Sequence, residues 1–303
     1  MKTALVTGCK GQDGALLSEL LRSRGYAVTG LDAGLGPDIT RAEQTLAVIE
    51  QVRPDEIYHL AAVHQSSEEE ARENVSLFRQ SYEVNFFAFL NLLEAARLKA
   101  PKARLFYAAS SHVFGNPPTE VQNESTPLAP DSPYAFSKVD GMAACRLYRE
   151  RHGVFAACGI LYTHESPLRS ERFLSKKIIA AAHRYAAGKS QPGEKLTVGD
   201  LSAVIDWGYA PDYVEAMTRI LALPSPDDFV IATGERHTVR EFVEEVFRLA
   251  GLDWTQYVVE NRSILKRASP VRIGNASKLK AATGWKPSLG FGEMIRVLFK
   301  GSR

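Results

Sequence analysis

The stretch Thr7-Gly8-Cys9-Lys10-Gly11-Gln12-Asp13-Gly14 decides the fold, because it joins the first apolar run of the chain to its first helical pattern. Residues 4–7 are apolar and β-branched, and residues 14–23 repeat apolar side chains at helical spacing. Glycines spaced in this way let the backbone turn tightly and bring its N–H groups against a diphosphate at a helix N-terminus. We therefore predict a dinucleotide-binding turn.

Strand-like runs alternate with helical patterns beyond this turn. The runs cover residues 4–7, 27–31, 56–62, 104–110, 156–162 and 229–233, and the helical patterns cover 14–23, 40–51, 84–98, 133–151 and 211–222. Short strands separated by helices indicate βαβ units, and so a parallel sheet with helices on both faces. We predict an α/β fold with a Rossmann-type doubly wound parallel sheet.

After residue 163 the pattern becomes mixed, with helical stretches at 173–187, 239–250, 278–283 and 291–300 and a short strand at 196–198. This change predicts a smaller α/β substrate-binding lobe. We assign residues 1–162 and 204–234 to the dinucleotide-binding domain, and residues 163–203 and 235–303 to the second lobe. Ligands of such sheets bind beyond the carboxyl ends of the strands, here between the two lobes.

Composition limits the partners. The 303 residues are 45% hydrophobic and carry a net charge of +2, which argues against nucleic acid as the main partner. Three cysteines without a CxxC pair favour neither a disulfide framework nor a zinc site, and we expect no bound metal. No apolar run approaches membrane-spanning length, so we expect a soluble cytoplasmic protein with no membrane partner.

Asp32 ends the second strand-like run, where an acid accepts hydrogen bonds from the adenosine ribose. An anion there repels a ribose phosphate, so we expect NAD rather than NADP. Asp38 and Ile39 suit a contact to adenine, although Asp38 is equally suited to cap the next helix. The expected cofactor contacts are Gly8, Gly11, Gln12, Asp13, Gly14, Asp32, Asp38, Ile39, Leu60, Ala61, Ala62, Tyr134, Lys138 and His164.

Tyr134 and Lys138 follow Pro133 at the start of a helical pattern. Their i,i+4 spacing places both side chains on one helix face. A nearby cation lowers the pKa of a phenol, so we expect Lys138 to help Tyr134 to take a hydroxyl proton while a hydride leaves the same carbon. Ser110 ends a strand-like run and offers a hydroxyl to the reacting oxygen.

These residues resemble extended short-chain dehydrogenases/reductases, and further stretches resemble the GDP-mannose 4,6-dehydratase family. The stretches are residues 7–14, 159–167, 206–208, 212–214, 232–234, 239–243 and 284–287, of which His164-Glu165-Ser166-Pro167 and Asp206-Trp207-Gly208 are the most specific. The resemblance covers nearly the whole chain. It implies a nucleotide-diphospho-sugar substrate, with a GDP-hexose favoured.

The resemblance also implies a three-stage reaction. Tyrosine and cofactor oxidise C4 of the hexose, water leaves from C5 and C6, and the stored hydride returns to C6. In this family a glutamate two residues after an active-site threonine acts in the elimination. Here Ser110 stands at the threonine position and His112 at the glutamate position. Histidine can act as an acid or base near neutral pH, although a structural or substrate-packing role stays open.

Other positions depart from the family. Ile205 stands where the family has an arginine suited to the substrate diphosphate, and Thr163 replaces an asparagine. An aliphatic side chain cannot neutralise a phosphate, so that contact must be lost or moved. The resemblance also implies a homodimer through the helical stretches 84–98 and 133–151. The expected substrate contacts are His64, Ser111, Thr163, Glu165, Arg169, Lys177 and Arg267.

Three functions remain open. The first is a sugar-nucleotide 4,6-dehydratase in which His112 replaces the glutamate. The second is a 4-epimerase, or a C4 dehydrogenase or ketoreductase, because such chemistry needs only Ser110, Tyr134, Lys138 and the cofactor. The third is a non-catalytic dinucleotide sensor, which the intact Tyr134 and Lys138 disfavour.

Overall fold

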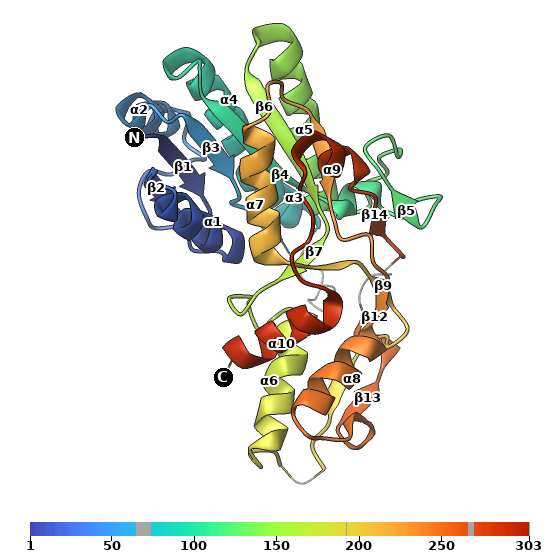
Figure 1. Cartoon of the computed structure of the whole chain (residues 1–303). Helices are drawn as coiled ribbons and strands as arrows, with labels where there is room; N and C mark the ends of the chain where they lie inside the picture. The colour runs from blue at the N-terminus through green and yellow to red at the C-terminus, as the bar shows by residue number, and fades with distance from the viewer. Residues whose placement is uncertain (65–73, 192, 266–269, 303) are drawn as a thin grey trace.

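A six-stranded parallel sheet forms the centre of the larger lobe (Figure 1). The computed structural model describes residues 1–64, 74–191, 193–265 and 270–302. The strand order is β11-β6-β4-β3-β1-β2, and each neighbouring pair is parallel. The predicted doubly wound sheet is confirmed. Its strands are β1 (Thr3–Thr7), β2 (Ala27–Leu31), β3 (Glu56–His59), β4 (Arg104–Ser110), β6 (Phe155–Leu161) and β11 (Asp228–Ile231).

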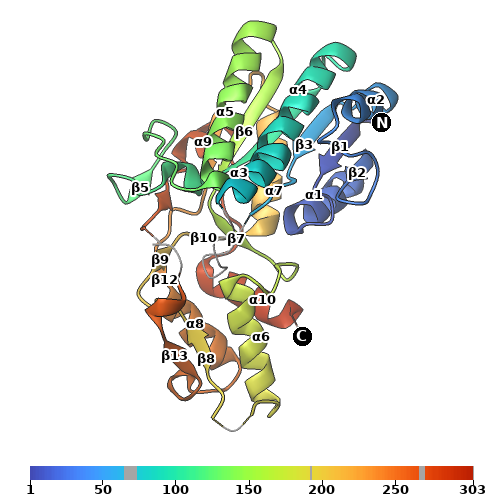
Figure 2. The ribbon, with the colours of Figure 1, turned by 180° about the vertical axis from the view of Figure 1, so that it is seen from behind.

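Helices cover both faces of this sheet, as the alternating sequence pattern predicts (Figures 1 and 2). Ala4 and Val6 belong to the core on one face and Leu5 to the core on the other, because neighbouring side chains of a strand point to opposite sides. One face carries α1 (Gln12–Ser23) and α7 (Ala210–Leu221), and the other carries α2 (Ala42–Val52), α4 (Ala88–Lys99) and α5 (Pro133–His152).

The helix predicted at residues 84–98 begins earlier than expected. A helix, α3 (Asn74–Tyr82), leads through a π-helical turn at Glu83–Phe87 directly into α4. Such a turn adds a residue to the helical repeat and often marks a functional position. Here it contains the buried Asn85.

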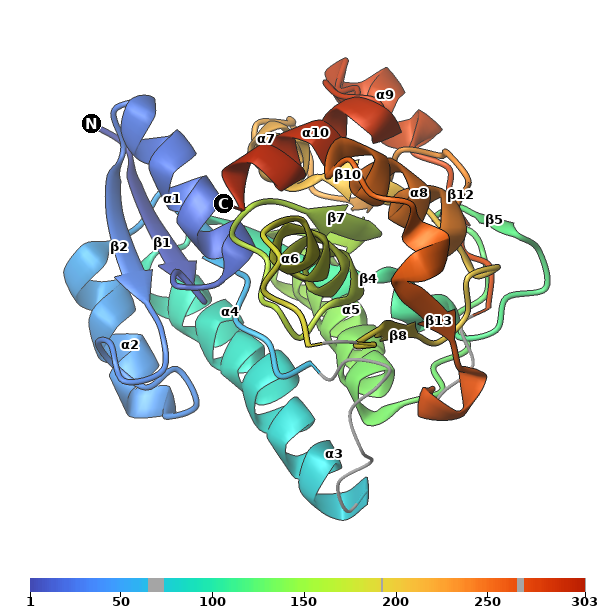
Figure 3. The same cartoon turned by 90° about the horizontal axis from the view of Figure 1, so that it is seen from below.

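The smaller lobe has its own apolar core and lies beyond the carboxyl ends of the sheet strands (Figure 1). Viewed from below, it lies under β4 and α5, whereas β1 and β2 lie to one side of it (Figure 3). Its elements are α6 (Leu174–Ala186), β8 (Leu196–Val198), α8 (Val239–Leu249), β13 (Val258–Glu260) and α10 (Phe291–Gly301).

Short strand pairs join the lobes and fix the segments between them. They are β7 (Thr163–Glu165) with β10 (Trp207–Tyr209), β9 (Val204–Ile205) with β12 (His237–Thr238), and β5 (Val121–Gln122) with β14 (Ile273–Gly274). The expected division of the chain stays a prediction, and one segment departs from it. Leu279 of α9 (Ser277–Thr283) and Trp285 pack in the core of the larger lobe, beside α7, and not with the second lobe.

Candidate active site

The carboxyl end of β4 carries the first part of the site. Ser110 ends the strand, and a short 3-10 turn, Ser111–Phe114, follows it and contains His112. The hydroxyl of Ser110 accepts a hydrogen bond from the backbone N–H of His112 at 3.3 Å. This edge of a parallel sheet is where ligand-binding side chains gather.

Helix α5 brings Tyr134 and Lys138 to the same edge. The helix starts at Pro133, and the hydroxyl of Ser132 caps it by accepting from the N–H of Ala135. Lys138 is only 1% exposed, and its Nζ donates to the carbonyl of Ala108 at 2.8 Å. The same Nζ lies 5.6 Å from the centre of the Tyr134 ring, so the two side chains share one helix face as predicted.

Two histidines lie against the ring of Tyr134. The ring of His64, from the segment after β3, lies edge-on at 4.6 Å between centroids. The ring of His112 lies at 5.9 Å in a similar edge-on arrangement, and the two histidine rings are 5.8 Å apart. Phe173 stacks on His64 from the side of the smaller lobe. Ser110, His112, Tyr134 and His64 are therefore brought together.

Burial governs the proton affinities of Tyr134 and Lys138. It raises the pKa of Tyr134 to about 12, although the hydroxyl of Ser110 and the charge of Arg169 act in the opposite direction. Burial also lowers the pKa of Lys138 to about 7. Burial, and not Lys138, therefore dominates the pKa of Tyr134 in this structure, and the effect of Lys138 on the phenol during catalysis stays a prediction. The ammonium group donates to Ala108, and removal of water outweighs the charges nearby.

The glycine turn after β1 fits a dinucleotide closely. Gly8 has a φ of +73°, and a Cβ on it would lie 2.7 Å from the backbone nitrogen of Ala61. A Cβ on Gly14 would lie 2.1 Å from the carbonyl oxygen of Gly8. Gly11 is the N-cap of α1 and has no side chain to cap it, so a bound diphosphate can accept from the first N–H groups of the helix. Only glycine at positions 8 and 14 lets the backbone of the turn pack this closely on itself and on the segment after β3.

Asp32 lies beside this turn, at the end of β2. Its Oδ2 accepts from the backbone N–H of Lys10 at 2.8 Å, and its Oδ1 accepts from the N–H of Ala33 at 2.8 Å. These bonds orient the carboxylate next to the turn, where the sequence predicts a contact to the adenosine ribose.

Asp38 does not cap the following helix, so that alternative is wrong. The N-cap of α2 is Arg41, and Asp38 accepts instead from the backbone and hydroxyl of Thr40 at 2.9 and 2.8 Å. Ile39 packs against the core beneath α4, and its carbonyl accepts from the side chain of Asn91. The contact of Asp38 and Ile39 to adenine stays a prediction.

The segment after β3 passes directly beside the glycine turn. The N–H of Leu60 donates to the carbonyl of Thr7 at 3.2 Å, and the N–H of Ala61 lies 3.4 Å from the hydroxyl of Thr7. Leu60, Ala61 and Ala62 therefore border the predicted cofactor site, which agrees with their assignment without testing it.

Asn85 is a residue that the sequence analysis missed. Its side chain exchanges hydrogen bonds with both backbone groups of Val63, at 2.8 and 3.2 Å, and donates to the hydroxyl of Ser137 at 3.0 Å. It thereby ties the segment that carries His64 to the helix that carries Tyr134. A polar residue within an apolar helical pattern was the available signal.

Asp13 and His164 connect the glycine turn to β7. His164 Nε2 lies 2.8 Å from Asp13 Oδ2, while its Nδ1 lies 2.6 Å from the carbonyl oxygen of Tyr162. Burial works against both charges, but their attraction prevails, so the pKa of Asp13 is lowered and that of His164 is raised. Gln12 adds a second link by accepting from Ser166 at 2.9 Å. The cofactor contacts proposed for Gln12, Asp13 and His164 stay predictions.

Arg169 lies at the interface of the two lobes near Tyr134. Its Nε is 3.4 Å from Glu165 Oε2, and its guanidinium stacks on the ring of Phe173 at 3.6 Å. Glu165 also accepts from the hydroxyl of Ser175 at 2.7 Å. The charge of Arg169 is therefore partly neutralised by the protein.

The remaining expected substrate contacts are spread over several elements. Thr163 lies in β7 opposite Trp207, Ser111 is buried after β4, and Lys177 lies in the first part of α6. Arg267 lies outside the described residues. Their contacts to substrate stay predictions.

Arg272 is a second residue that the sequence analysis missed. It forms an isolated parallel bridge with Ile205, the position where the family resemblance implied an arginine. Its Nη1 donates to the carbonyl of Gly115 at 2.8 Å, and burial lowers its pKa. No local sequence signal reveals this neighbour, because the two positions meet only through the chain topology.

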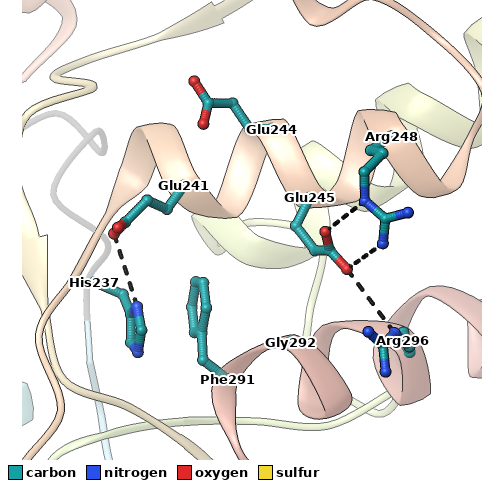
Figure 4. A pocket seen from close by; sticks show the side chains of 8 residues that line it. All are labelled: His237, Glu241, Glu244, Glu245, Arg248, Phe291, Gly292 and Arg296. Carbon is teal, nitrogen blue, oxygen red and sulfur yellow. Dashed lines mark hydrogen bonds and ion pairs between the residues drawn. The ribbon is translucent and has the colours of Figure 1, made fainter.

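A surface pocket of about 530 Å³ lies elsewhere, between α8 and α10 (Figure 4). His237 stacks on Phe291 at one end, and Glu245 pairs with Arg248 and Arg296 at the other. None of the predicted site residues lines it, so we place the active site at the sheet edge and not here.

Metal clusters and membrane-spanning helices are both absent from the part of the chain that the structure describes. Within residues 1–64, 74–191, 193–265 and 270–302, no group of three or more His, Cys, Asp or Glu is arranged to hold a metal ion. None of the helices in those ranges combines the length and hydropathy that a membrane crossing requires.

Known proteins resemble this chain along most of its length. Residues 35–298 match the family model described as GDP-mannose 4,6 dehydratase. The chain is 37% identical to GDP-mannose 4,6 dehydratase 2 of Arabidopsis thaliana, over 98% of this chain and 86% of that protein. It is 33% identical to GDP-mannose 4,6-dehydratase of Sinorhizobium fredii (strain HH103), over 94% and 92% of the two chains.

Solved structures share the fold over its full length. A UDP-glucose 4-epimerase of Thermus thermophilus, solved in complex with NAD, is 27% identical with a TM-score of 0.81, covering 99% of both chains. A putative epimerase from Burkholderia cenocepacia J2315 is 23% identical with a TM-score of 0.85, covering 100% of this chain and 98% of the other.

Proposed function

Because the chain belongs to the GDP-mannose 4,6-dehydratase family, we propose that it dehydrates a GDP-hexose, with GDP-mannose as the first candidate. The observation that carries this proposal is the convergence of Ser110, His112 and Tyr134 at the carboxyl end of β4. Such an arrangement supplies a base for C4 oxidation and a separate acid/base for elimination.

The glycine turn fits a nicotinamide dinucleotide, because Gly8 and Gly14 allow a tight backbone turn that any Cβ would block, and the first N–H groups of α1 have no side-chain cap. Gly11 and the N-terminus of α1 would hold the diphosphate, and Asp32 the adenosine ribose. The Asp32 carboxylate would repel a ribose phosphate, so we propose NAD as the preferred form. When bound, the cofactor supplies reversible hydride transfer.

In its deprotonated, phenolate form, Tyr134 would take the proton of the C4 hydroxyl, with Ser110 donating a hydrogen bond to the same oxygen. Lys138 sits behind the phenol with a pKa of about 7, so it can release or accept a proton near neutral pH. The role of these residues is therefore to move one proton at C4.

His112 would act in the elimination. Its imidazole would remove the proton from C5, and the imidazolium would give a proton to the C6 hydroxyl, which leaves as water. The electron pair of the C5–H bond becomes the C5–C6 double bond, so atoms and charge balance. The ring of His64 lies edge-on to Tyr134 and next to the ring of His112.

The test is incubation of the protein and NAD with GDP-mannose, followed by mass spectrometry of the sugar nucleotide. Loss of one water without net formation of NADH supports the proposal. His112→Gln should still oxidise C4 but stop before dehydration, whereas His112→Glu should dehydrate. A product of unchanged mass but altered retention would instead identify a 4-epimerase, and net NADH in proportion to sugar would identify a dehydrogenase.

We also propose that the enzyme is a homodimer formed by the face of α3, α4 and α5 seen in Figure 2. This face exposes the large apolar side chains Phe78, Phe87, Leu98, Phe136 and Leu147. Exposed apolar side chains grouped on one face are typical of protein interfaces. All three cysteines are free, which fits our proposal that the enzyme works in the cytoplasm.

A further inference from the structure

Arg272 and Ile205 lie on one face between the two lobes. They are partners in a parallel bridge, so their side chains project to the same side of the backbone pair. Asp206, the next residue after Ile205, accepts from the backbone N–H of Gly274 at 3.0 Å. This bond keeps the segment of Arg272 beside that of Ile205.

From this position Arg272 contacts the segment that follows β4. Its Nη1 donates to the carbonyl of Gly115, three residues after His112. The charge of Asp131, three residues before Tyr134, and the phenol of Tyr162 also act on its guanidinium. The guanidinium therefore contacts the segment that follows His112 and senses the charge of the segment that precedes Tyr134.

The protein balances the charge of Arg272 only in part, because Asp131 acts on the guanidinium without forming an ion pair with it. Burial lowers its pKa, and it forms no ion pair with any residue in the described part of the chain. Its Nε and Nη2 donate to no described residue, yet neither is a fully enclosed atom, so both keep contact with solvent. The carbonyl of Gly115 holds Nη1 of the guanidinium group, and Nε and Nη2 are available to a ligand.

Two other cations near the site are already engaged. Arg169 is paired with Glu165, and Lys138 donates to Ala108. Ile205 cannot neutralise any charge. A nucleotide sugar brings a diphosphate with two negative charges, and guanidinium groups bind phosphate oxygens through paired hydrogen bonds.

We propose that Arg272 binds the diphosphate of the nucleotide sugar, beside Ile205. This inference rests on the proposed function, since it takes a nucleoside diphospho-sugar as the substrate. The bound diphosphate would accept hydrogen bonds from Nε and Nη2 of Arg272, while the carbonyl of Gly115 still accepts from Nη1.

The test measures binding by calorimetry to the full-length protein saturated with NAD. For Arg272→Gln, the dissociation constant of GDP should rise about 10- to 100-fold, as expected for loss of a charged hydrogen bond. The affinities for guanosine and for NAD should stay within about twofold of wild type. The GDP affinity of Arg272→Lys should lie between those of wild type and Arg272→Gln, because lysine keeps the charge but cannot form the paired hydrogen bonds of a guanidinium.

Two further variants test whether a loss of GDP affinity comes from the missing charge or from misfolding. Adding Ile205→Arg to Arg272→Gln should restore part of the GDP affinity, because the new guanidinium starts from the same face. Arg236→Gln is the matched control, since Arg236 is 51% exposed and already paired with Glu120. It should leave GDP binding unchanged. A normal NAD affinity for each variant shows that it is folded.

The outcomes are distinct. If wild type binds GDP and Arg272→Gln binds it equally well, the inference fails while the proposed function stands. Loss of affinity for GDP-mannose alone would place Arg272 at the hexose and overturn the inference as well. If wild type binds UDP or dTDP but not GDP, in an Arg272-dependent manner, the inference stands and the GDP-hexose assignment falls. If none of these nucleotides binds, both fail.

Discussion

Replacing Lys138 by methionine should make the folded protein more stable at neutral pH while removing catalysis. The ammonium group is 1% exposed, donates to the carbonyl of Ala108 and lies over the rings of Tyr107 and Tyr134. Burial disfavours its charged form and lowers its pKa from 10.5 to about 7. Methionine fills a similar volume without a charge.

The size of the effect follows from proton linkage. The unfolded chain keeps a lysine pKa near about 10.4, so between pH 7 and 10 the unfolded state binds more protons and this group makes stability rise with pH. The charged lysine then costs the folded protein about 4–5 kcal/mol at pH 6 and about 2 kcal/mol at pH 9. Loss of the hydrogen bond to Ala108 offsets about 1 kcal/mol in the variant.

Urea unfolding of both proteins at pH 6, 7, 8 and 9, followed by tryptophan fluorescence, measures this difference. The buried Cys145 also titrates differently on unfolding, but it is common to both proteins and its contribution cancels. The free energy of unfolding of Lys138→Met should exceed that of wild type by about 3 kcal/mol at pH 6, and this difference should be smaller by about 2–3 kcal/mol at pH 9. Lys102→Met, at an exposed site, is the control. A pH-independent difference, or a less stable variant at pH 6, would refute the reasoning.

Three other changes test the site. Tyr134→Phe should lower turnover by at least about 10²-fold and leave NAD affinity nearly unchanged, and full activity in that variant would reject the phenol as the base. Gly14→Ala puts a methyl group 2.1 Å from the Gly8 carbonyl oxygen, so it should cost about 1–3 kcal/mol of stability by denaturant unfolding and weaken NAD binding in a titration. In a double-mutant cycle of Asp13→Asn and His164→Gln, the coupling energy should be about 1–3 kcal/mol near pH 6. Because the pKa of Asp13 is lowered and that of His164 raised, this coupling should disappear as the pH falls through the pKa of Asp13, below 3.8, or rises through that of His164, above 6.5, and a constant value from pH 5 to 9 would contradict an ion pair.

The sheet could be predicted because its signals are local. Each strand is a short apolar run, and Gly8 and Gly14 occupy positions that tolerate no side chain. The residues at which helices begin and end were harder to predict from the sequence. The π-helical turn around Asn85 joins α3 to α4 through contacts with Val63 and Ser137, and these partners are distant in the sequence. The packing of Trp285 against the larger lobe is likewise set by the topology.

The site was only partly accessible for the same reason. The helix spacing of Tyr134 and Lys138 follows from local geometry, and the structure agrees with it. The proton affinities do not follow, because they depend on how much water the fold excludes. The phenol has a raised pKa and the lysine a lowered one, the opposite of what two charges in water would give.

If Arg272 binds the substrate diphosphate as proposed, the two departures from the family would act on one quantity, the charge that surrounds the bound substrate. A glutamate at position 112 would add a negative charge to the site, which a histidine does not. Less positive charge would then be needed to hold the substrate diphosphate. The single guanidinium of Arg272, on the segment beside Ile205, could supply this charge. Arg272 lies immediately before β14, which pairs with β5, and it reaches the carbonyl of Gly115, just after His112. The histidine and the displaced cation are therefore expected to depend on each other: His112→Glu should weaken GDP binding in wild type, and more strongly when Arg272 is replaced.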